Sequence, residues 1–600
     1  MYQYTEFDKT FIQQRTAQHR DQLTRYLAGE LSDDEFKPLR LQNGWYVQRY
    51  APMLRVAVPY GEISGTQLRM LARIAHEYDQ PSHAVFDKAI RTQASLGTTH
   101  LPVGHGHFST RQNVQFNWIP LDKSADVMDL LATVNMHGIQ TSGNCIRNIT
   151  TDELAGIAPD EIADPRPFAE IIRQWSTLHP EFAFLPRKFK IAITGATNDR
   201  AAVRWHDVGL YLIKDAEGEL GFRVMVGGGM GRTPVISTEI RAFLPWQHIM
   251  NYLEALVRVY NRFGRRDNIY KARIKILVKA EGRRYIDEVE AEFQNILTQD
   301  GAPHTISLAE YDRVAASFVA PASNAYTYAA TNSIVNGNSA TNLIKPSEEK
   351  EYQRWLKQNV VAHQNPALRA VTLSFKRLGQ APGDADAKQL ETAAQLAEQF
   401  SAGEARVTHD QNLLLPWVRA EDLPALWQAA RQAGLAKSNI RLLTDMIACP
   451  GGDFCALANA RSLPIAAQIT ARYQDMDELH DLGEIDLHIS GCINSCGHHH
   501  SGHIGILGVD KDGQEWYQVT LAGSDGSDLS GAAQPGKVVG PAFHADEVAD
   551  VVEALLDCYR QLRMPSEAFI DTLRRCGLDE FKTAANAARH SETAEEALSI

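Results

Sequence analysis

The sequence repeats itself at a separation of about half its length. The segment QNVQFNWI at residues 112–119 recurs as QNLLLPWV at residues 411–418. Three further blocks recur in the same order: residues 191–198 with 487–494, 208–218 with 504–514, and 253–263 with 552–562. A single block of this kind arises easily by chance among alternating strands. Four collinear blocks predict an internal duplication with a pseudo-two-fold arrangement.

The repeated blocks also predict the class of fold. The copies at 112–119 and 411–418 have the pattern of strands. Each is followed by a stretch in which apolar residues recur at helical spacing, at 124–139 and at 421–435. We therefore expect an α/β (mixed α+β) fold, internally duplicated, with two related halves that meet at a shared interface.

Length and charge exclude several classes of protein. A chain of 600 residues is too long for a single hydrophobic core, so several domains are expected. The formal net charge of -13 argues against a nucleic-acid partner. The N-terminal stretch MYQYTEFDKTFIQQR lacks the apolar core of a secretory signal, and no apolar run is long enough to cross a bilayer. We expect a cytoplasmic protein that binds neither nucleic acid nor membrane.

Four of the seven cysteines lie in two closely spaced pairs. Cys449 and Cys455 form a C-x5-C pair, and Cys492 and Cys496 form a C-x3-C pair. Four thiolates from two loops match the ligand set of a cubane iron–sulfur cluster. Structural zinc sites use C-x2–4-C pairs, so the five-residue gap fits zinc poorly. The spacing favours iron–sulfur over zinc and over ordinary buried cysteines, without deciding among them.

The repeat assigns this chemistry to one half only. Ala196 in the first half occupies the position that Cys492 occupies in the second. We therefore expect the first half to bind no metal. Three other cysteines have no such grouping and are interpreted as small core or surface residues: Cys145, Cys558 and Cys576.

The cysteine motifs carry a family resemblance. The stretches ACPGGDFCALANARS and HISGCINSCGHHHSGHIGILGV resemble the paired C-x5-C and G-C-x-N-x-C-G signatures of siroheme sulfite and nitrite reductases. The resemblance runs from about Leu39 to about Arg563. It implies a siroheme and a [4Fe–4S] cluster with four ligands: Cys449, Cys455, Cys492 and Cys496. It also implies that Cys496 bridges the cluster to the siroheme iron and so couples the two electronically.

Four basic segments resemble the anion site of the same family. The MLR and IRN segments imply that Arg55 and Arg147 contact the substrate, and LPRKFK implies that Lys188 and Lys190 lie beside the bound anion. The TRQ segment implies that Arg111 holds siroheme carboxylates, a role that Arg147 and Lys188 are expected to share. If LPRKFK is a strand, its two lysines point to one face. Buried anions need such fixed cations because the effective dielectric constant is low.

Three further segments have weaker signals. Residues 270–275, YKARIK, alternate like a strand and resemble a basic segment of the family. The run His498–His500 is interpreted as loop histidines near the cofactor, because consecutive residues converge poorly on one ion. The glycine-rich run Gly227–Gly231 lacks a nucleotide-loop pattern and predicts a tight turn or a close backbone approach.

The resemblance implies a function and a domain order. It implies six-electron reduction of sulfite to hydrogen sulfide in sulfate assimilation, with reduction of nitrite to ammonia as the nearest alternative. LPRKFK and MLR favour sulfite, whereas GGDFC departs from the sulfite-type pattern. A non-catalytic iron–sulfur regulator would not need the basic residues. No flavin or nicotinamide motif is present, so the donor is expected to be a flavoprotein reductase subunit or a ferredoxin.

The expected domains follow from the repeat and the resemblance together. They are an N-terminal segment with the first ferredoxin-like half-domain (1–120), a first siroheme-binding domain (121–320), a linker (321–350), a second ferredoxin-like half-domain (351–425), a domain with the cluster cysteines (426–565) and a polar C-terminal tail (566–600).

Overall fold

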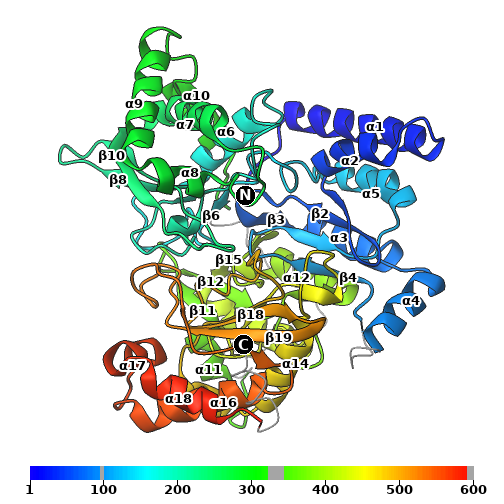
Figure 1. The fold of residues 1–600 in the computed structure, drawn as a ribbon, viewed down its shortest axis with the longest axis vertical. Coiled ribbons are helices and arrows are strands. Elements are labelled where there is room, and N and C mark those ends of the chain that lie inside the picture. The colour runs from blue at the N-terminus through cyan, green and yellow to red at the C-terminus, as the bar shows by residue number, and fades with distance from the viewer. Residues whose placement is uncertain (95–100, 322–343, 591–600) are drawn as a thin grey trace.

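The computed structural model describes residues 1–94, 101–321 and 344–590. In Figure 1 the first half lies above and the second half below, and the two meet along the middle of the molecule. The linker predicted over residues 321–350 falls mostly outside the described residues.

Two small antiparallel sheets lie at the centre, and each half lends one strand to the other. The first sheet has the order β1 (Trp45–Val47), β2 (Pro52–Val56), β5 (Val114–Phe116), β4 (His105–Phe108) and β13 (Asp384–Asp386). The second has the order β11 (Val360–Ala362), β12 (Leu368–Leu373), β15 (Leu413–Arg419), β14 (Glu404–Val407) and β3 (Glu62–Ser64). Neither half-domain is therefore self-contained.

Each lent strand leads directly into a helix. β3 runs into α3 (Gly65–Glu77), and β13 runs into α12 (Ala387–Phe400). Ser64 and Asp386 cap these helices with the same reciprocal pattern of hydrogen bonds to the third helical residue. The two helices belong to one hydrophobic core, so the halves share a centre rather than a thin interface.

Two larger sheets have the same topology in each half. The first has the order β10 (Thr238–Pro245), β9 (Leu220–Val226), β8 (Val208–Lys214), β7 (Ile191–Thr194) and β6 (Thr150–Thr151). The second contains β16 (Ile447–Ala448), β17 (Leu487–Ser490), β18 (Ile504–Lys511), β19 (Gln514–Leu521) and β20 (Lys537–Val538), with β21 (Phe543–His544) beside β19. In each, three strands run parallel and the next is antiparallel. The predicted duplication is confirmed.

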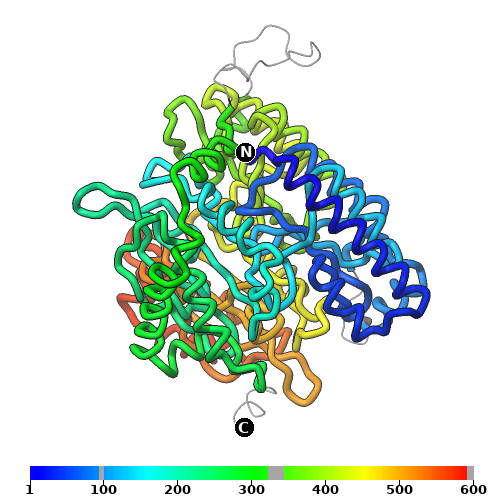
Figure 2. Tube along the Cα trace, turned by 90° about the horizontal axis from the view of Figure 1, so that it is seen from above, coloured from blue at the N-terminus to red at the C-terminus, as the bar shows by residue number. Residues whose placement is uncertain are grey.

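The helices predicted from the repeat are present in both halves. They are α5 (Ser124–Thr133) and α13 (Leu423–Gln432), then α7 (Ile249–Phe263) and α16 (Val548–Leu562). The other helices that flank the large sheets are α6 (Arg166–Ser176), α8 (Ile274–Glu281), α9 (Arg283–Thr298), α10 (Leu308–Ala315), α14 (Leu463–Arg472) and α15 (Met476–Leu482). Four more helices are α1 (Glu6–Leu27), α2 (Asp33–Gln42), α4 (His83–Ala94) and α11 (Glu349–Asn359). Figure 2 shows α1 along the edge of the molecule.

The polar C-terminal tail predicted over residues 566–600 contains two short helices in its described part. α17 (Phe569–Cys576) and α18 (Asp579–Ala587) form there. Phe569, Leu573 and Phe581 are buried in the same core as α16, because each short helix has one apolar face that needs cover. Residues 591–600 lie outside the described part of the chain. None of the described helices is long and apolar enough to cross a membrane.

Candidate active site between the two halves

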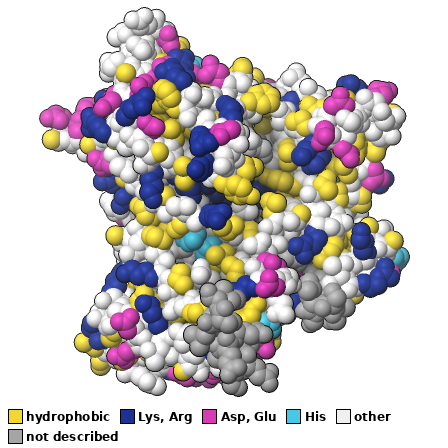
Figure 3. Space-filling view, viewed as in Figure 1, with side chains coloured by type: hydrophobic (Ala, Val, Ile, Leu, Met, Phe, Trp, Pro, Cys, Tyr) yellow, Lys and Arg dark blue, Asp and Glu magenta, His cyan; other side chains and the backbone are white. Residues whose placement is uncertain are grey.

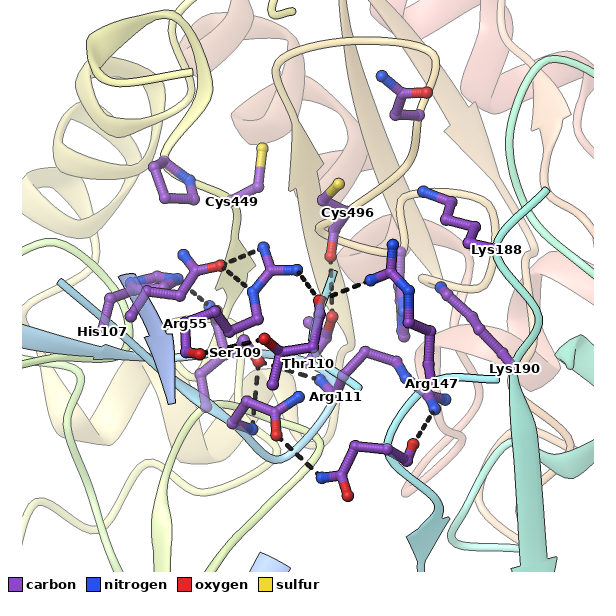
Figure 4. Close-up of a pocket in the computed structure, with 18 of the residues that line it drawn as sticks. Arg55, His107, Ser109, Thr110, Arg111, Arg147, Lys188, Lys190, Cys449 and Cys496 are labelled. Atoms are coloured by element: carbon purple, nitrogen blue, oxygen red, sulfur yellow. Dashed lines mark hydrogen bonds between the residues drawn. The ribbon is translucent and has the colours of Figure 1, made fainter. Parts of the chain in front are cut away.

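A cavity lies where the two halves meet. On the face shown in Figure 3 the surface is hollowed there, with Lys and Arg side chains around the hollow. The first half contributes the five predicted cations: Arg55, Arg111, Arg147, Lys188 and Lys190. The second half contributes Cys449, Cys496 and His498. Figure 4 shows the two sulfurs on one side of the cavity, with Arg55 and the two lysines on opposite flanks.

Neutral oxygen atoms hold Arg55 and Arg147 in place. Arg55, on β2, donates from Nε to Gln115 Oε1 at 2.9 Å and from Nη1 to the Thr141 carbonyl at 3.2 Å. Arg147 donates from Nη1 to the same carbonyl at 2.6 Å and from Nη2 to the Gly143 carbonyl at 2.8 Å. Neither guanidinium pairs with a carboxylate in the described part of the chain. Both positive charges therefore remain available to an anion in the cavity.

Lys188 and Lys190 flank Phe189, which bridges to Ile146 just before β7 begins. The run is extended there without being a full strand. Neither ammonium group has a hydrogen bond or an ion pair to any described residue. Burial, with Arg147 and Arg273 nearby, lowers the pKa of Lys188 to about 8. Burial also holds the pKa of Lys190 well below its usual value. Amines of this kind can give up protons near neutral pH.

Arg111 is positioned in part by His206, a residue that no sequence motif had indicated. Its Nη2 donates to the Asn148 carbonyl at 2.7 Å, and its Nη1 donates to His206 Nε2. His206 Nδ1 lies 2.9 Å from the Ala202 carbonyl, which can only accept, so Nε2 is the acceptor nitrogen. Burial holds the pKa of His206 well below its usual value. Burial, with Arg147 nearby, lowers the pKa of Arg111 to about 9.

The four predicted cysteines lie at the carboxyl ends of two adjacent parallel strands. Cys449 follows β16, and Cys492 follows β17 by two residues. Three sulfurs have N–H neighbours: Cys449 Sγ lies 3.3 Å from Gly491 N, Cys455 Sγ 3.4 Å from Leu457 N, and Cys492 Sγ 3.5 Å from Asn494 Nδ2. Such N–H donors stabilise cluster-bound thiolates. Burial and the neighbouring Cys496 raise the pKa of Cys449 to about 12, so metal binding must displace its proton.

Two glycines of the second cysteine motif are required by close backbone approach. A Cβ on Gly497 would lie 1.9 Å from the Ile489 carbonyl oxygen, and a Cβ on Gly491 would lie 2.5 Å from that of Ala460. Any larger side chain would push the loops apart. These glycines therefore set the spacing of the thiols.

The geometry does not suit a single metal ion. Across the described residues, no group of three or more His, Cys, Asp or Glu side chains is placed to hold one ion. A structural zinc site needs four ligands that converge on one centre. In a cubane cluster each thiolate binds a different iron, so cluster ligands need not converge on one centre.

The first half has an ion pair where the second has thiols. Asp152 follows β6 as Cys449 follows β16, and counting from β7 and β17 matches Arg200 with Cys496. Arg200 Nε lies 2.7 Å from Asp152 Oδ2. A salt bridge therefore occupies the positions that match two of the predicted cluster cysteines.

The remaining sequence interpretations have mixed outcomes. YKARIK is not a strand: a turn precedes α8, which begins at Ile274. Lys275 lies in the first turn of α8, and its Nζ donates to the Gly229 and Met230 carbonyls. It therefore caps the glycine-rich loop instead of facing the cavity. His498 lines the cavity, whereas His500 Nε2 contacts the Gly231 carbonyl at 3.0 Å.

Fold and site together define a duplicated α/β protein with one cysteine quartet beside one basic cavity. The family description "Nitrite and sulphite reductase 4Fe-4S domain" matches residues 142–297 and 441–591, and "Nitrite/Sulfite reductase ferredoxin-like half domain" matches residues 372–433. The chain belongs to this nitrite and sulfite reductase family of oxidoreductases.

The relatives of this chain include proteins named as sulfite reductases and proteins named as nitrite reductases. It is 26% identical to "Sulfite reductase [ferredoxin] 1" of Mycolicibacterium paratuberculosis, over 82% of this chain and 80% of the relative. It is also 26% identical to "Ferredoxin--nitrite reductase" of Synechococcus elongatus, over 84% and 85%. The solved "Structure of Mycobacterium tuberculosis NirA protein" covers 92% of both chains with a TM-score of 0.69 at 22% identity, a likeness of fold.

Proposed function

We propose that this chain is a siroheme- and [4Fe–4S]-dependent sulfite reductase that reduces sulfite to hydrogen sulfide. The observation that carries the proposal is the joining of five cations from one half with the thiols of the other in one buried cavity. Reduction of nitrite to ammonia is the second candidate, because the relatives include nitrite reductases at equal identity.

The residues fit both cofactors. Siroheme carries many carboxylates, and Arg111, Arg147 and Lys188 line the cavity without a carboxylate partner of their own in the described chain. Four thiols fit a [4Fe–4S] cluster: Cys449, Cys455, Cys492 and Cys496. When bound, the two groups would supply electrons one at a time, and Cys496 would be among the residues that hold them.

The protein's own residues would bind the anion and supply protons. Arg55 and Arg147 would hold the oxyanion, because a guanidinium offers a fixed fork of donors. Reduction of sulfite consumes six electrons and eight protons and yields hydrogen sulfide and three water molecules. Lys188 and Lys190 would donate protons to the departing oxygens and regain them from solvent. Their lowered pKa values suit this exchange near neutral pH.

The electron donor is proposed from the relatives. Both relatives described above carry ferredoxin in their names. We expect this chain to accept electrons from a ferredoxin rather than from a flavoprotein reductase subunit. Turnover with purified candidates of each kind would decide between the two donors.

The decisive experiment compares two substrates on the loaded enzyme. The purified protein should show a siroheme absorption band, with iron and acid-labile sulfide for one cluster. With an artificial electron donor, kcat/KM for sulfite should exceed that for nitrite. The reverse order would make the chain a nitrite reductase. A loaded protein that reduces neither anion would refute the proposal.

A further inference from the structure

Two glutamines occupy matching places in the two small sheets. Gln112 follows β4 and Gln411 follows β14, each in the tight turn that leads into the next strand. Both have a left-handed backbone, with φ of 56° and 62°. Residues other than glycine are uncommon in this conformation and are strained there. A glutamine in place of a glycine at both turns therefore points to a use for the side-chain amide.

Gln411 completes the open edge of β16. This strand lies at the end of its sheet, and Cys449 N donates to the Ile489 carbonyl of β17 at 3.2 Å. The N–H and C=O of Ala448 face the other way, where no described strand pairs with them. Gln411 Oε1 accepts from Ala448 N at 2.9 Å, and Gln411 Nε2 lies 3.0 Å from the Ala448 carbonyl. Ala448 is fully buried, so either group would be costly to leave unpaired.

The same amide ties this edge to the first half of the chain. Gln411 Nε2 also lies 3.0 Å from the Phe108 carbonyl on β4 and 3.1 Å from His107 Nε2. Gln411 is itself only 1% exposed and lines the cavity, as Cys449 does. One side chain thus joins a strand of the first half to the peptide that leads into Cys449. Without this amide, the Cys449 sulfur would be free to move relative to its N–H neighbour, Gly491 N.

The first half supplies a matched comparison. Gln112 Nε2 donates to the Val407 carbonyl at 3.2 Å, and Gln112 Oε1 accepts from Thr151 N at 3.2 Å. Thr151 on β6 stands where Ala448 stands on β16, but an aspartate follows it instead of a cysteine. The two glutamines therefore bridge the halves in the same way, and of the two only Gln411 holds the peptide ahead of a predicted cluster ligand.

We propose that Gln411 is a positioning residue for the iron–sulfur cluster. Its amide fixes the peptide ahead of Cys449 and so keeps that thiolate in place for iron. This inference rests on the proposed function, because it requires the cluster. Groups that orient a metal ligand from behind matter to binding, and their replacement costs about 10- to 100-fold in metal affinity or activity. Gln411 should therefore govern how firmly the cluster is retained.

The test compares the loaded Gln411→Leu and Gln112→Leu proteins with the loaded wild type. Leucine has a similar size but no amide, so each variant loses one bridge between the halves and should unfold at a lower temperature. With a ferrous chelator and without oxygen, iron should leave Gln411→Leu about 10-fold faster than the wild type. Iron release from Gln112→Leu should match the wild type. The EPR spectrum of the reduced cluster should change in Gln411→Leu alone, which a general loss of stability would not produce.

A third variant keeps the proposal falsifiable if Gln411→Leu does not fold. Gln411→Glu keeps an acceptor for Ala448 N–H but has no amide hydrogens for the two carbonyls, so iron should still leave it faster than the wild type. Wild-type iron release and EPR spectra in the folded Gln411 variants would overturn the proposal, as would equally fast release from Gln112→Leu.

Failure of the proposed function would look different. A loaded wild-type protein that reduces neither anion would refute the proposed function and leave the role of Gln411 intact. A wild-type protein that holds no iron or acid-labile sulfide would overturn both.

Discussion

At the scale of single residues, the cations of the candidate site come from one half of the chain and the cysteines from the other. Arg55 and Arg147 are held by carbonyl and amide oxygens, so their charge is not neutralised before a ligand binds. The thiols are held by backbone turns whose glycines permit close approach. Each group can therefore be removed without disturbing the other, which makes their roles separable by experiment.

The two lysines should affect turnover and leave cofactor content intact. Lys188→Met or Lys190→Met removes the charge while keeping much of the side-chain length. Sulfite kcat should fall by roughly 10²–10⁴-fold if general acid catalysis is lost. In the wild type, the contribution of Lys188 should fade as pH rises through about 8, because its donating form is lost there. Unchanged kinetics in fully loaded variants would return both lysines to a structural role.

The cysteine ligands should behave as a set. Cys455→Ser should remove iron and acid-labile sulfide, because a cubane needs all four thiolates. Cys558→Ser is the control, since Cys558 lies on α16 and outside both cysteine pairs. Iron and sulfide assays on both purified proteins would check this. Full cluster content in the Cys455→Ser protein would count against the assignment.

At the scale of elements, the lent strands explain how the halves are joined. β3 and β13 each pair with a strand of the opposite half and then start a capped helix. The cap fixes the direction in which the chain leaves the strand. Cap, lent strand and central helix therefore form one unit in each half.

Loss of a cap should weaken this unit measurably. Asp386 accepts from Gln389 N at 2.8 Å, and its own N–H donates to Gln389 Oε1 at 3.0 Å. Asp386→Ala should lower the free energy of unfolding by about 1 kcal/mol. Gln399→Ala, an exposed change on the same helix, is the control. Thermal unfolding midpoints that drop equally for both would show that the cap contributes nothing special.

At the scale of the whole molecule, the duplication gave the two halves equivalent positions that carry different side chains. One half holds the cysteine quartet, and the other has Asp152 and Arg200 at the matching places. Asp152 is only 2% exposed, so its charge depends on its partner. The ion pair links the segments that follow β6 and β7, where no cluster is expected.

Breaking this pair should destabilise the fold and spare the cluster. Arg200→Met leaves Asp152 buried without its closest cation, a change that should lower the free energy of unfolding by about 3–5 kcal/mol. Arg20→Met breaks an exposed pair with Asp126 and should change it by about 1 kcal/mol at most. Denaturation curves and iron content would be measured together. Lost iron with unchanged stability in Arg200→Met would contradict this view of the pair.

The sequence by itself determined the duplication, the strands that begin each repeat and the motifs that supply thiols and cations. These features are local: a motif of a few residues fixes its own spacing, and periodic apolar residues fix an element. The fold class followed from them. The lysine run, the MLR strand and the two cysteine pairs can therefore be identified from the sequence alone.

Only the tertiary structure decided which distant residues meet. His107 and Asp384 are separated by 277 positions and touch because a strand is lent between the halves. His206 reaches Arg111 across 95 positions, and Arg200 reaches Asp152 across 48. No local pattern encodes such pairs, since burial and packing choose them after the elements have formed. The hydrogen bond from Lys275, in the YKARIK segment, to the carbonyl of Met230, 45 residues away, is likewise not encoded in the local pattern.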